Sequence, residues 1–209
     1  MAGSASIERL EAGGIFFKVF FPPRPSPGLL LLPESRSSTV ESLAEKLLLE
    51  EFSVVLPESF PGYTEILTAF EDLRSNSPVK SRVLQWWVWG EGRGGLWALR
   101  LSRDLGAEIR GLILDSLRAE DREEASGLLS ALRKPHLLFH PQLEDSFPFP
   151  EAERMFTLSP AHAKKLLLLP GMRRGEVLLK SPDLYVQTIA EFVNPRAGRW
   201  RRKKDSLRG

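Results

Sequence analysis

Short apolar runs alternate along the chain with longer segments in which apolar residues recur every three or four positions. Wholly apolar runs bounded by turn residues are typical of strands that are buried on both faces, and spacing of three or four residues is typical of amphipathic helices. After an N-terminal hairpin, the expected strands are residues 28–32, 52–56, 83–89, 109–114, 136–140 and 165–169. The expected helices are residues 37–50, 63–74, about 95–104, 119–132, 150–156 and 182–193.

The hairpin is predicted from two strand-like segments, residues 7–11 and 15–21, around Ala12-Gly13-Gly14. Strands that alternate with helices require right-handed crossovers and a mostly parallel sheet covered on both faces. The sequence therefore predicts an α/β fold, a three-layer sandwich. Its eight-stranded, mostly parallel sheet begins with an antiparallel hairpin and carries no large lid. We expect one domain over residues 1–195, followed by a flexible basic tail over residues 196–209.

Composition places the chain among globular proteins. Hydrophobic residues make up 42% and charged residues 27% of the 209 positions. The apolar runs are far shorter than the roughly 20 residues that a membrane-spanning helix needs. No apolar segment suited to a secretory signal follows the start, so we expect a cytoplasmic protein without a transmembrane segment. Scarce Asn, Gln and Cys beside abundant Glu, Arg, Leu and Pro is a thermophile-like bias.

The absence of cysteine excludes disulfides and thiolate chemistry. The three histidines, His136, His140 and His162, are too few for a histidine-based metal site, and we interpret them as structural. We expect no metal and no cofactor.

Charge is concentrated at the C-terminus. Residues 196–209 carry seven Lys or Arg and one Asp, which gives 7 − 1 = +6, so the other residues carry 2 − 6 = −4. Such a block is commonly a solvated terminus, although it can also bind phosphates through counterion release. The candidate phosphate or surface contacts in this block are Arg199, Trp200, Arg201, Arg202, Lys203 and Lys204.

A glycine cluster, Gly90-Glu91-Gly92-Arg93-Gly94-Gly95, follows an apolar strand and opens a helix. This is the context of a nucleophile elbow, G-x-S-x-G, with Gly92 where the serine would stand. The same residues also fit a G-x-G-x-x-G phosphate loop, for which Asp115 would be the acidic residue about 20 positions on. That fingerprint normally follows the first strand of its unit, whereas this cluster follows the fifth strand of the chain.

Two further segments favour the elbow interpretation. His140-Pro141-Gln142-Leu143-Glu144-Asp145-Ser146-Phe147-Pro148 resembles the H-G-x-x-D-x-x-V-P segment that carries the acid in α/β-hydrolase-fold enzymes. The run 166–169, followed by Pro170-Gly171-Met172-Arg173-Arg174-Gly175-Glu176, resembles their last strand and the loop that carries the histidine. The order of elbow, acid and histidine loop is that of the α/β-hydrolase fold superfamily. The chain resembles this superfamily over residues 7–193.

The resemblance implies a triad in which two members are replaced. Gly92 stands at the serine position and has no side chain, while Arg174 stands at the histidine position and cannot release a proton near neutrality. Asp145 alone matches, at the position of the acid. We therefore expect no catalytic residue among the triad positions and interpret the chain as a degenerate member of the superfamily.

The loop after the third strand is altered as well. It reads Pro33-Glu34, and with Arg93 it forms the oxyanion-hole region that the resemblance implies. Proline has no N–H to donate, and the carboxylate of Glu34 would repel an oxyanion. We expect Arg174 to form an ion pair with Asp145 and Glu34 to approach the same region. The rival is a small anion bound at the start of the helix, beside Arg93 or Arg174.

Three functional hypotheses follow. The first is a catalytically inactive, hydrolase-like pseudoenzyme that binds an unknown protein or small-molecule ligand. The second is an active esterase-like hydrolase, a carboxylic ester hydrolase, that uses displaced residues such as Ser35, Ser37 or Ser116. The third is a nucleic-acid-associated accessory protein that makes weak contact through its basic tail.

Overall fold

The computed structural model describes residues 4–60 and 62–194. Eight strands form one sheet in the order β1-β2-β4-β3-β5-β6-β7-β8. β1 pairs antiparallel with β2 and β2 with β4, and every other neighbouring pair is parallel. The strands are β1 (Ser6–Ala12), β2 (Ile15–Phe21), β3 (Ser26–Leu32), β4 (Ser53–Pro57), β5 (Val83–Glu91), β6 (Ile109–Asp115), β7 (His136–Pro141) and β8 (Lys164–Leu169). The predicted mostly parallel sheet with its N-terminal hairpin is confirmed.

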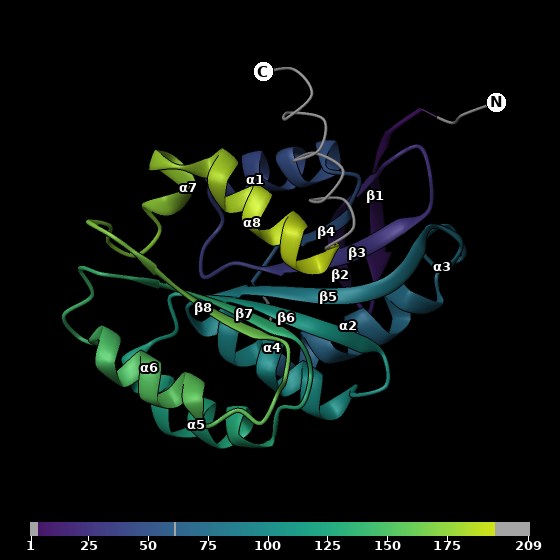
Figure 1. The fold of residues 1–209 in the computed structure, drawn as a ribbon. Coiled ribbons are helices and arrows are strands. Elements are labelled where there is room, and N and C mark those ends of the chain that lie inside the picture. Colours follow the sequence, from purple (N-terminus) through teal and green to yellow (C-terminus); the bar gives the residue numbers. More distant parts are fainter. Residues whose placement is uncertain (1–3, 61, 195–209) are drawn as a thin grey trace.

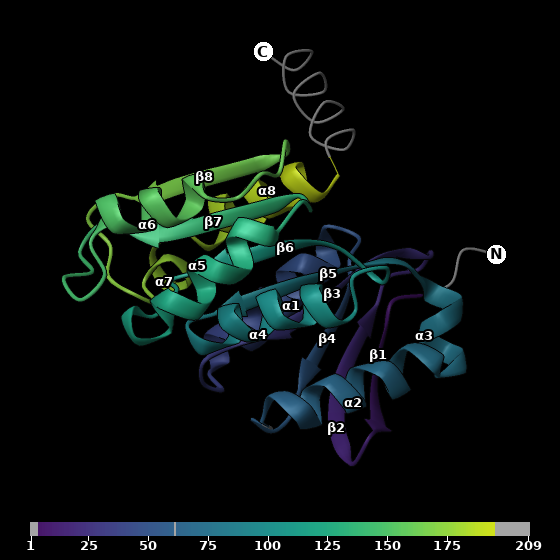
Figure 2. The ribbon, with the colours of Figure 1, turned by 90° about the horizontal axis from the view of Figure 1, so that it is seen from below.

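Helices cover both faces of the sheet (Figure 1). One face packs against α1 (Ser38–Leu49), α7 (Val177–Lys180) and α8 (Pro182–Val193). The other face packs against α2 (Tyr63–Ser75), α4 (Arg93–Asp104), α5 (Arg122–Ala131) and α6 (Phe149–Thr157), which lie nearest the viewer in Figure 2. Two separate hydrophobic cores result, one on each side of the sheet.

The tryptophans of β5 fill core volume, as their apolar run predicts. Trp86 belongs to the core on the α4 side, whereas Trp87 and Trp89 belong to the core on the α8 side. Each of the first two lies beside a glycine on a neighbouring strand, because Gly28 pairs with Trp86 and Gly111 pairs with Trp87. A Cβ at Gly111 would lie 2.7 Å from a ring atom of Trp87, so a glycine there leaves room for the indole.

The structure departs from the predicted elements at three places. The break after α2 is followed by a short helix, α3 (Ser77–Arg82), and α7 lies in a segment predicted to be loop. The helix predicted over residues 119–132 begins with a 3-10 turn, Ala119–Asp121, and continues as α5. No helix in the described part of the chain combines the length and apolar character that crossing a bilayer requires.

Because β3 and β5 to β8 are parallel, their carboxyl ends lie at one edge of the sheet and their amino ends at the other. The elbow after β5, the loop after β3 and the loops after β6, β7 and β8 therefore meet at the carboxyl edge. Gly92 and Asp145 follow the carboxyl ends of β5 and β7, so they lie at the same edge, as the triad positions implied by the resemblance require.

Candidate functional site at the carboxyl edge of the sheet

The turn between β5 and α4 has the geometry of a nucleophile elbow. Gly92 has φ +55° and ψ −119°, a conformation that residues with a Cβ rarely adopt. Its neighbours allow the strand and the helix to approach closely. A Cβ at Gly90 would lie 2.5 Å from the carbonyl carbon of Gly94, and a Cβ at Gly94 would lie 2.7 Å from the carbonyl carbon of Leu32.

The carboxylate of Glu34 occupies the space in front of Gly92. A Cβ built on Gly92 would lie 2.6 Å from Cδ of Glu34 and closer still to its Oε2. Glu34 reaches this point from the loop after β3, the loop that the resemblance associates with the oxyanion hole. The protein therefore carries its own anion at the start of α4, where the rival interpretation expected a bound one.

Two arginines hold the Glu34 carboxylate in place. Nη1 of Arg174 lies 3.2 Å from Oε2 of Glu34, and Nη1 of Arg118 lies 3.2 Å from Oε1. Arg174 also reaches Glu144, with its Nε 3.3 Å from Oε2 of that residue. These side chains are each 15–28% exposed, so the network is partly shielded from solvent. We call Glu34, Arg118, Arg174 and Glu144 the carboxyl-edge network.

The prediction that Arg174 forms an ion pair with Asp145 is wrong. Asp145 is exposed, and it forms no ion pair with any other residue in the described ranges 4–60 and 62–194. Arg174 instead forms an ion pair with Glu144, the residue before Asp145. The loop after β7 directs the Glu144 side chain towards the loop after β8. The predicted approach of Glu34 to Arg174 is confirmed.

The oxyanion-hole region lacks free donors on the β3 side. Pro33 has no N–H, and the N–H of Glu34 donates to Oε2 of Glu91 over 3.5 Å. Arg93, the residue after the elbow, has an exposed side chain. A substrate oxyanion would therefore meet two carboxylates, from Glu34 and Glu91, where hydrolysis requires hydrogen-bond donors.

Glu91 has an unusual protonation equilibrium. Burial raises the pKa of its carboxyl to about 7, and the negative charges of Asp115 and Glu34 act in the same direction. The hydrogen bond from the Glu34 N–H and the positive charge of Arg174 oppose the rise. Glu91 is thus a carboxyl that can exchange a proton near neutrality.

A buried hydrogen-bond chain lies behind the elbow. Nε1–H of Trp89 donates to the Tyr185 hydroxyl over 2.7 Å, and that hydroxyl donates to Oδ2 of Asp115 over 2.6 Å. Oγ of Ser116 donates to Oδ1 of the same carboxylate over 2.6 Å. Burial raises the pKa of Asp115, while these two donors lower it. In a dinucleotide site built on the G-x-G-x-x-G pattern, Asp115 would have to bind a ribose hydroxyl. Both of its oxygens already accept hydrogen bonds inside the protein, so it is poorly placed to do so.

Ser116 is one of the displaced serines considered above. It is 1% exposed and has a φ of +50°, an uncommon conformation for a residue with a side chain. Its hydroxyl is bound to Asp115 directly, with no imidazole between them. Ser37 caps α1, because its side chain accepts a hydrogen bond from the N–H of Val40, and Ser35 is exposed.

Two of the three histidines have core positions, whereas His162 is exposed. His136 and His140 are at most 1% exposed, and burial lowers the pKa of both. The ring of His140 packs edge-on against Phe147, with 5.5 Å between ring centroids. Among the described residues, no three carboxylate or histidine side chains gather closely enough to hold a metal ion. The tail residues predicted to contact phosphates, Arg199–Lys204, lie outside the described residues.

Comparisons with known proteins bear on the fold. No protein-family model matches the chain, and no curated protein matches it in sequence. Solved structures match over nearly the whole chain. A dienelactone hydrolase from Anabaena variabilis has a TM-score of 0.75 at 15% identity, covering 90% of this chain and 97% of its own.

Two further solved structures are similarly close. Est1E from Butyrivibrio proteoclasticus has a TM-score of 0.71 at 14% identity, covering 90% of this chain and 97% of its own. An esterase from Pyrococcus furiosus has a TM-score of 0.73 at 13% identity, covering 92% of this chain and 91% of its own. At these identities the likeness is one of fold, and this chain has the α/β-hydrolase fold.

Proposed function

We propose that this chain is a non-hydrolytic protein with an α/β-hydrolase fold, which acts as a binding module. The observation that carries the proposal is the Glu34 carboxylate in front of Gly92. The space that a nucleophile needs is filled by an anion, and two arginines hold that anion in place.

Acyl transfer needs four groups: a nucleophile, a base that accepts its proton, an acid that orients the base, and donors for the oxyanion. Position 92 offers no side-chain atom, and position 174 offers a guanidinium that stays protonated. The Glu34 N–H is directed at Glu91, and Asp145 is exposed. The nucleophile and the base are thus missing from the positions that the fold uses for them, and the acid that remains, Asp145, has no base to orient.

The second candidate function is an esterase-like hydrolase with a displaced catalytic set. The comparisons favour this alternative over the binding module, because structures that match are named as a hydrolase and an esterase. Within the chain, support comes from Ser116, which lies at the same edge and is bonded to Asp115. The pKa of Glu91, about 7, suits a general base.

An active-site probe separates the two candidates. The full-length protein is treated with a fluorescent fluorophosphonate and, separately, with p-nitrophenyl acetate, beside Ser116→Ala and its matched control Ser35→Ala. The binding-module proposal expects no labelling of any of the three proteins and no burst of p-nitrophenol. Labelling that disappears in Ser116→Ala and persists in Ser35→Ala would overturn the proposal in favour of the esterase-like hydrolase.

Restoring the serine alone is a second test. Gly92→Ser, once shown to be folded by circular dichroism, is expected to remain unlabelled, because Arg174 cannot act as a base. Labelling of Gly92→Ser would contradict this, since it would mean that a base lies within reach of position 92.

A further inference from the structure

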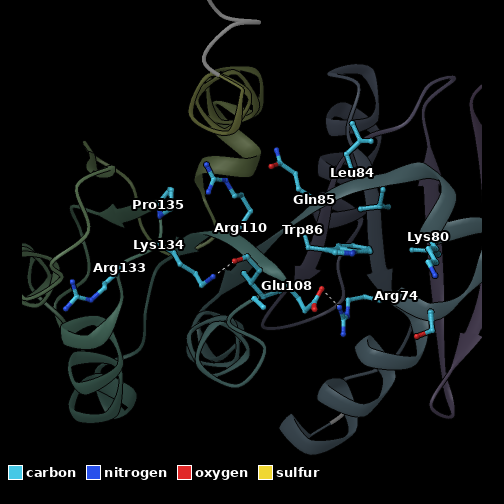
Figure 3. A pocket seen from close by; sticks show the side chains of 15 residues that line it. Arg74, Lys80, Leu84, Gln85, Trp86, Glu108, Arg110, Arg133, Lys134 and Pro135 are labelled. Carbon is cyan, nitrogen blue, oxygen red and sulfur yellow. Dashed lines mark hydrogen bonds and ion pairs between the residues drawn. The ribbon is translucent and has the colours of Figure 1, made fainter.

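A cavity of about 880 Å³ lies where the amino ends of β5 and β6 meet α2 and α3. Its polar side chains diverge. In Figure 3, Arg110 and Gln85 point to one side of the sheet, whereas Lys134 and Arg74 point to the other. These side chains do not converge on a single ligand. The open side of the last strand, β8, differs in this respect, because its groups all face one way.

The two outer strands of the sheet differ in their side chains. β1, at one end of the strand order, carries Glu8, Arg9 and Glu11 among its seven residues. Charged side chains on an outer strand hinder its pairing with a further strand. β8, at the other end, has lysine in its first two positions only and continues as four leucines, residues 166–169. Figure 2 shows β8 along the upper margin of the molecule. Within the described residues, β8 pairs with β7 alone, so its other side is open.

The leucines of β8 are only partly covered by the rest of the protein. All four are half-buried. Leu166 packs against the core on the α4 side, and Leu167 and Leu169 pack against the core on the α8 side. In the described part of the chain, Leu168 packs against neither core. Burial of the remaining apolar surface against a partner would be favourable.

The backbone groups of β8 alternate between β7 and the open side. The N–H of His136 donates to the carbonyl of Ala163, and the N–H of Gln142 donates to that of Leu169, both over 3.0 Å. Because β7 and β8 are parallel and in continuous register, every second residue of β8 has its N–H and C=O directed at β7. The N–H and C=O groups of the other three residues point to the open side; these residues are Lys164, Leu166 and Leu168.

Two copies of this strand match each other when they run antiparallel. With a twofold axis beside Leu166, that residue lies opposite Leu166 of the second copy, and Lys164 lies opposite Leu168. All outward N–H and C=O groups of both strands are then paired. A shift by one residue would place outward groups opposite inward ones, and a shift by two would leave Lys164 beyond the end of the second strand.

The charges on β8 favour the same arrangement. Nζ of Lys164 donates to backbone carbonyls of its own chain, including that of Ser159 over 2.6 Å. Lys165 is therefore the exposed charge of the strand. In the antiparallel pair it lies opposite Leu167 of the second copy. In a parallel pair it would lie opposite another Lys165, and like charges in that position are destabilising.

We infer that this protein forms a dimer in which two copies of β8 pair antiparallel and join the two sheets into one. Both copies contribute the same strand, so the contact closes on itself. The charged strand β1 offers no comparable surface for further growth. The contact is one strand long and falls at the small end of specific interfaces, about 1,200 Å² or less in total, so we expect a reversible dimer. The inference goes beyond the proposed binding function and does not depend on it.

The oligomeric state of the full-length protein is the first test. Sedimentation velocity over a series of protein concentrations should show monomer passing into dimer, with no larger species. Leu168→Pro removes one outward N–H and places its ring towards the second copy, yet it breaks no bond to β7, so the monomer should fold. We expect the dissociation constant to rise at least about tenfold. The matched control, Leu168→Ala, keeps the N–H and should remain dimeric. Circular dichroism confirms that each variant is folded.

Introduced cysteines test the register, because the chain has none of its own. Leu166→Cys places two thiols opposite each other, with about 5.5 Å between the Cα atoms, a separation that a disulfide spans. In Leu168→Cys the two cysteines are four residues apart along the strands, about 13–14 Å, which is too far. Under mild oxidation we expect Leu166→Cys to form a covalent dimer in non-reducing gel electrophoresis and Leu168→Cys to stay monomeric there.

Four results would overturn the inference. The first is a wild type that stays monomeric throughout the concentration series. The second is a folded Leu168→Pro variant that dimerises like the wild type. The third is growth into larger oligomers as concentration rises. The fourth is equal cross-linking of the two cysteine variants, or none in either, and this comparison decides the matter if Leu168→Pro fails to fold.

Discussion

The carboxylate of Glu34 lies where the first side-chain atom of residue 92 would have to be. Because Gly92 has no Cβ, the two residues fit together, and a Cβ there would lie 2.6 Å from Cδ of Glu34. The position of the glutamate in the loop after β3 therefore depends on a glycine at the elbow. A side chain at position 92 would displace the Glu34 carboxylate, whereas a smaller residue at position 34 would leave more room at position 92.

This dependence predicts that Gly92→Ser destabilises the protein. A residue with a Cβ at φ +55° costs about 1–3 kcal/mol in backbone strain, and the displacement of Glu34 from Arg118 and Arg174 adds to it. We expect the free energy of unfolding to fall by about 2–4 kcal/mol in urea denaturation.

A double-mutant cycle separates the strain from the overlap. Glu34→Ala removes the carboxylate, so Gly92→Ser should cost less in that background than in the wild type. We expect the two substitutions to differ from additivity by at least about 1 kcal/mol, as residues in contact do. Simple additivity would mean that Glu34 is not held in front of Gly92 in solution.

The raised pKa of Glu91 predicts that the stability of the protein depends on pH. Its carboxyl has a pKa of about 7 in the folded protein and of about 4.5 in the unfolded chain. The folded state therefore holds more protons between these two values, and stability falls as pH rises through that window. Glu91→Gln removes this loss. The variant should unfold like the wild type near pH 4.5 and become more stable above pH 7, by up to about 3 kcal/mol.

The measurement is the free energy of urea unfolding from pH 4.5 to pH 8. Glu45→Gln, which makes the same change at an exposed helical position, serves as the control and should show no such trend. A Glu91→Gln variant with the same stability difference at every pH would show that the pKa of Glu91 is the same in the folded and the unfolded protein.

Most of the fold could be predicted from the sequence, because its signals are local. The apolar run in β5 and the glycines after it define a strand, a tight turn and a helix without information from elsewhere in the chain. The helices α3 and α7 were missed because six and four residues are too few to establish a helical period.

The site could be predicted only in part. The positions of Gly92, Glu34 and Arg174 follow from strand order, which determines which loops share an edge. The choice of Glu144 over Asp145 depends on the conformation of one loop, since adjacent residues there point in different directions. Tyr185 lies 70 positions from Asp115, and no local pattern connects them.

The buried chain behind the elbow predicts a strong effect of Tyr185→Phe. Removing the hydroxyl leaves the Trp89 N–H without an acceptor and Oδ2 of Asp115 without a donor, both inside the core. Each unsatisfied buried group costs about 1–3 kcal/mol, so we expect a loss of roughly 2–4 kcal/mol. Tyr63→Phe removes a hydroxyl that donates to Asp104 at the surface and should cost less than about 1 kcal/mol in the same urea denaturation experiment. Equal losses would contradict the buried position of the chain.

Two helical glycines should respond to alanine with opposite signs. Gly94 lies in the first turn of α4, where a Cβ would be 2.7 Å from the carbonyl carbon of Leu32. That atom belongs to the backbone of β3, so α4 would have to move away from the sheet. Gly127 lies inside α5 with no atom within 4 Å of a Cβ placed on it, so alanine there adds helix propensity without overlap.

We therefore expect Gly94→Ala to lower the free energy of unfolding by about 3 kcal/mol or more, as overpacking against backbone does. Gly127→Ala should raise it by up to about 1 kcal/mol. In a protein of this length, each kcal/mol corresponds to about 2–4 °C in Tm, so thermal denaturation resolves both shifts. If Gly94→Ala melted at or above the wild-type temperature, the close contact between the start of α4 and the end of β3 would be wrong. The elbow geometry that depends on this contact would then be wrong as well.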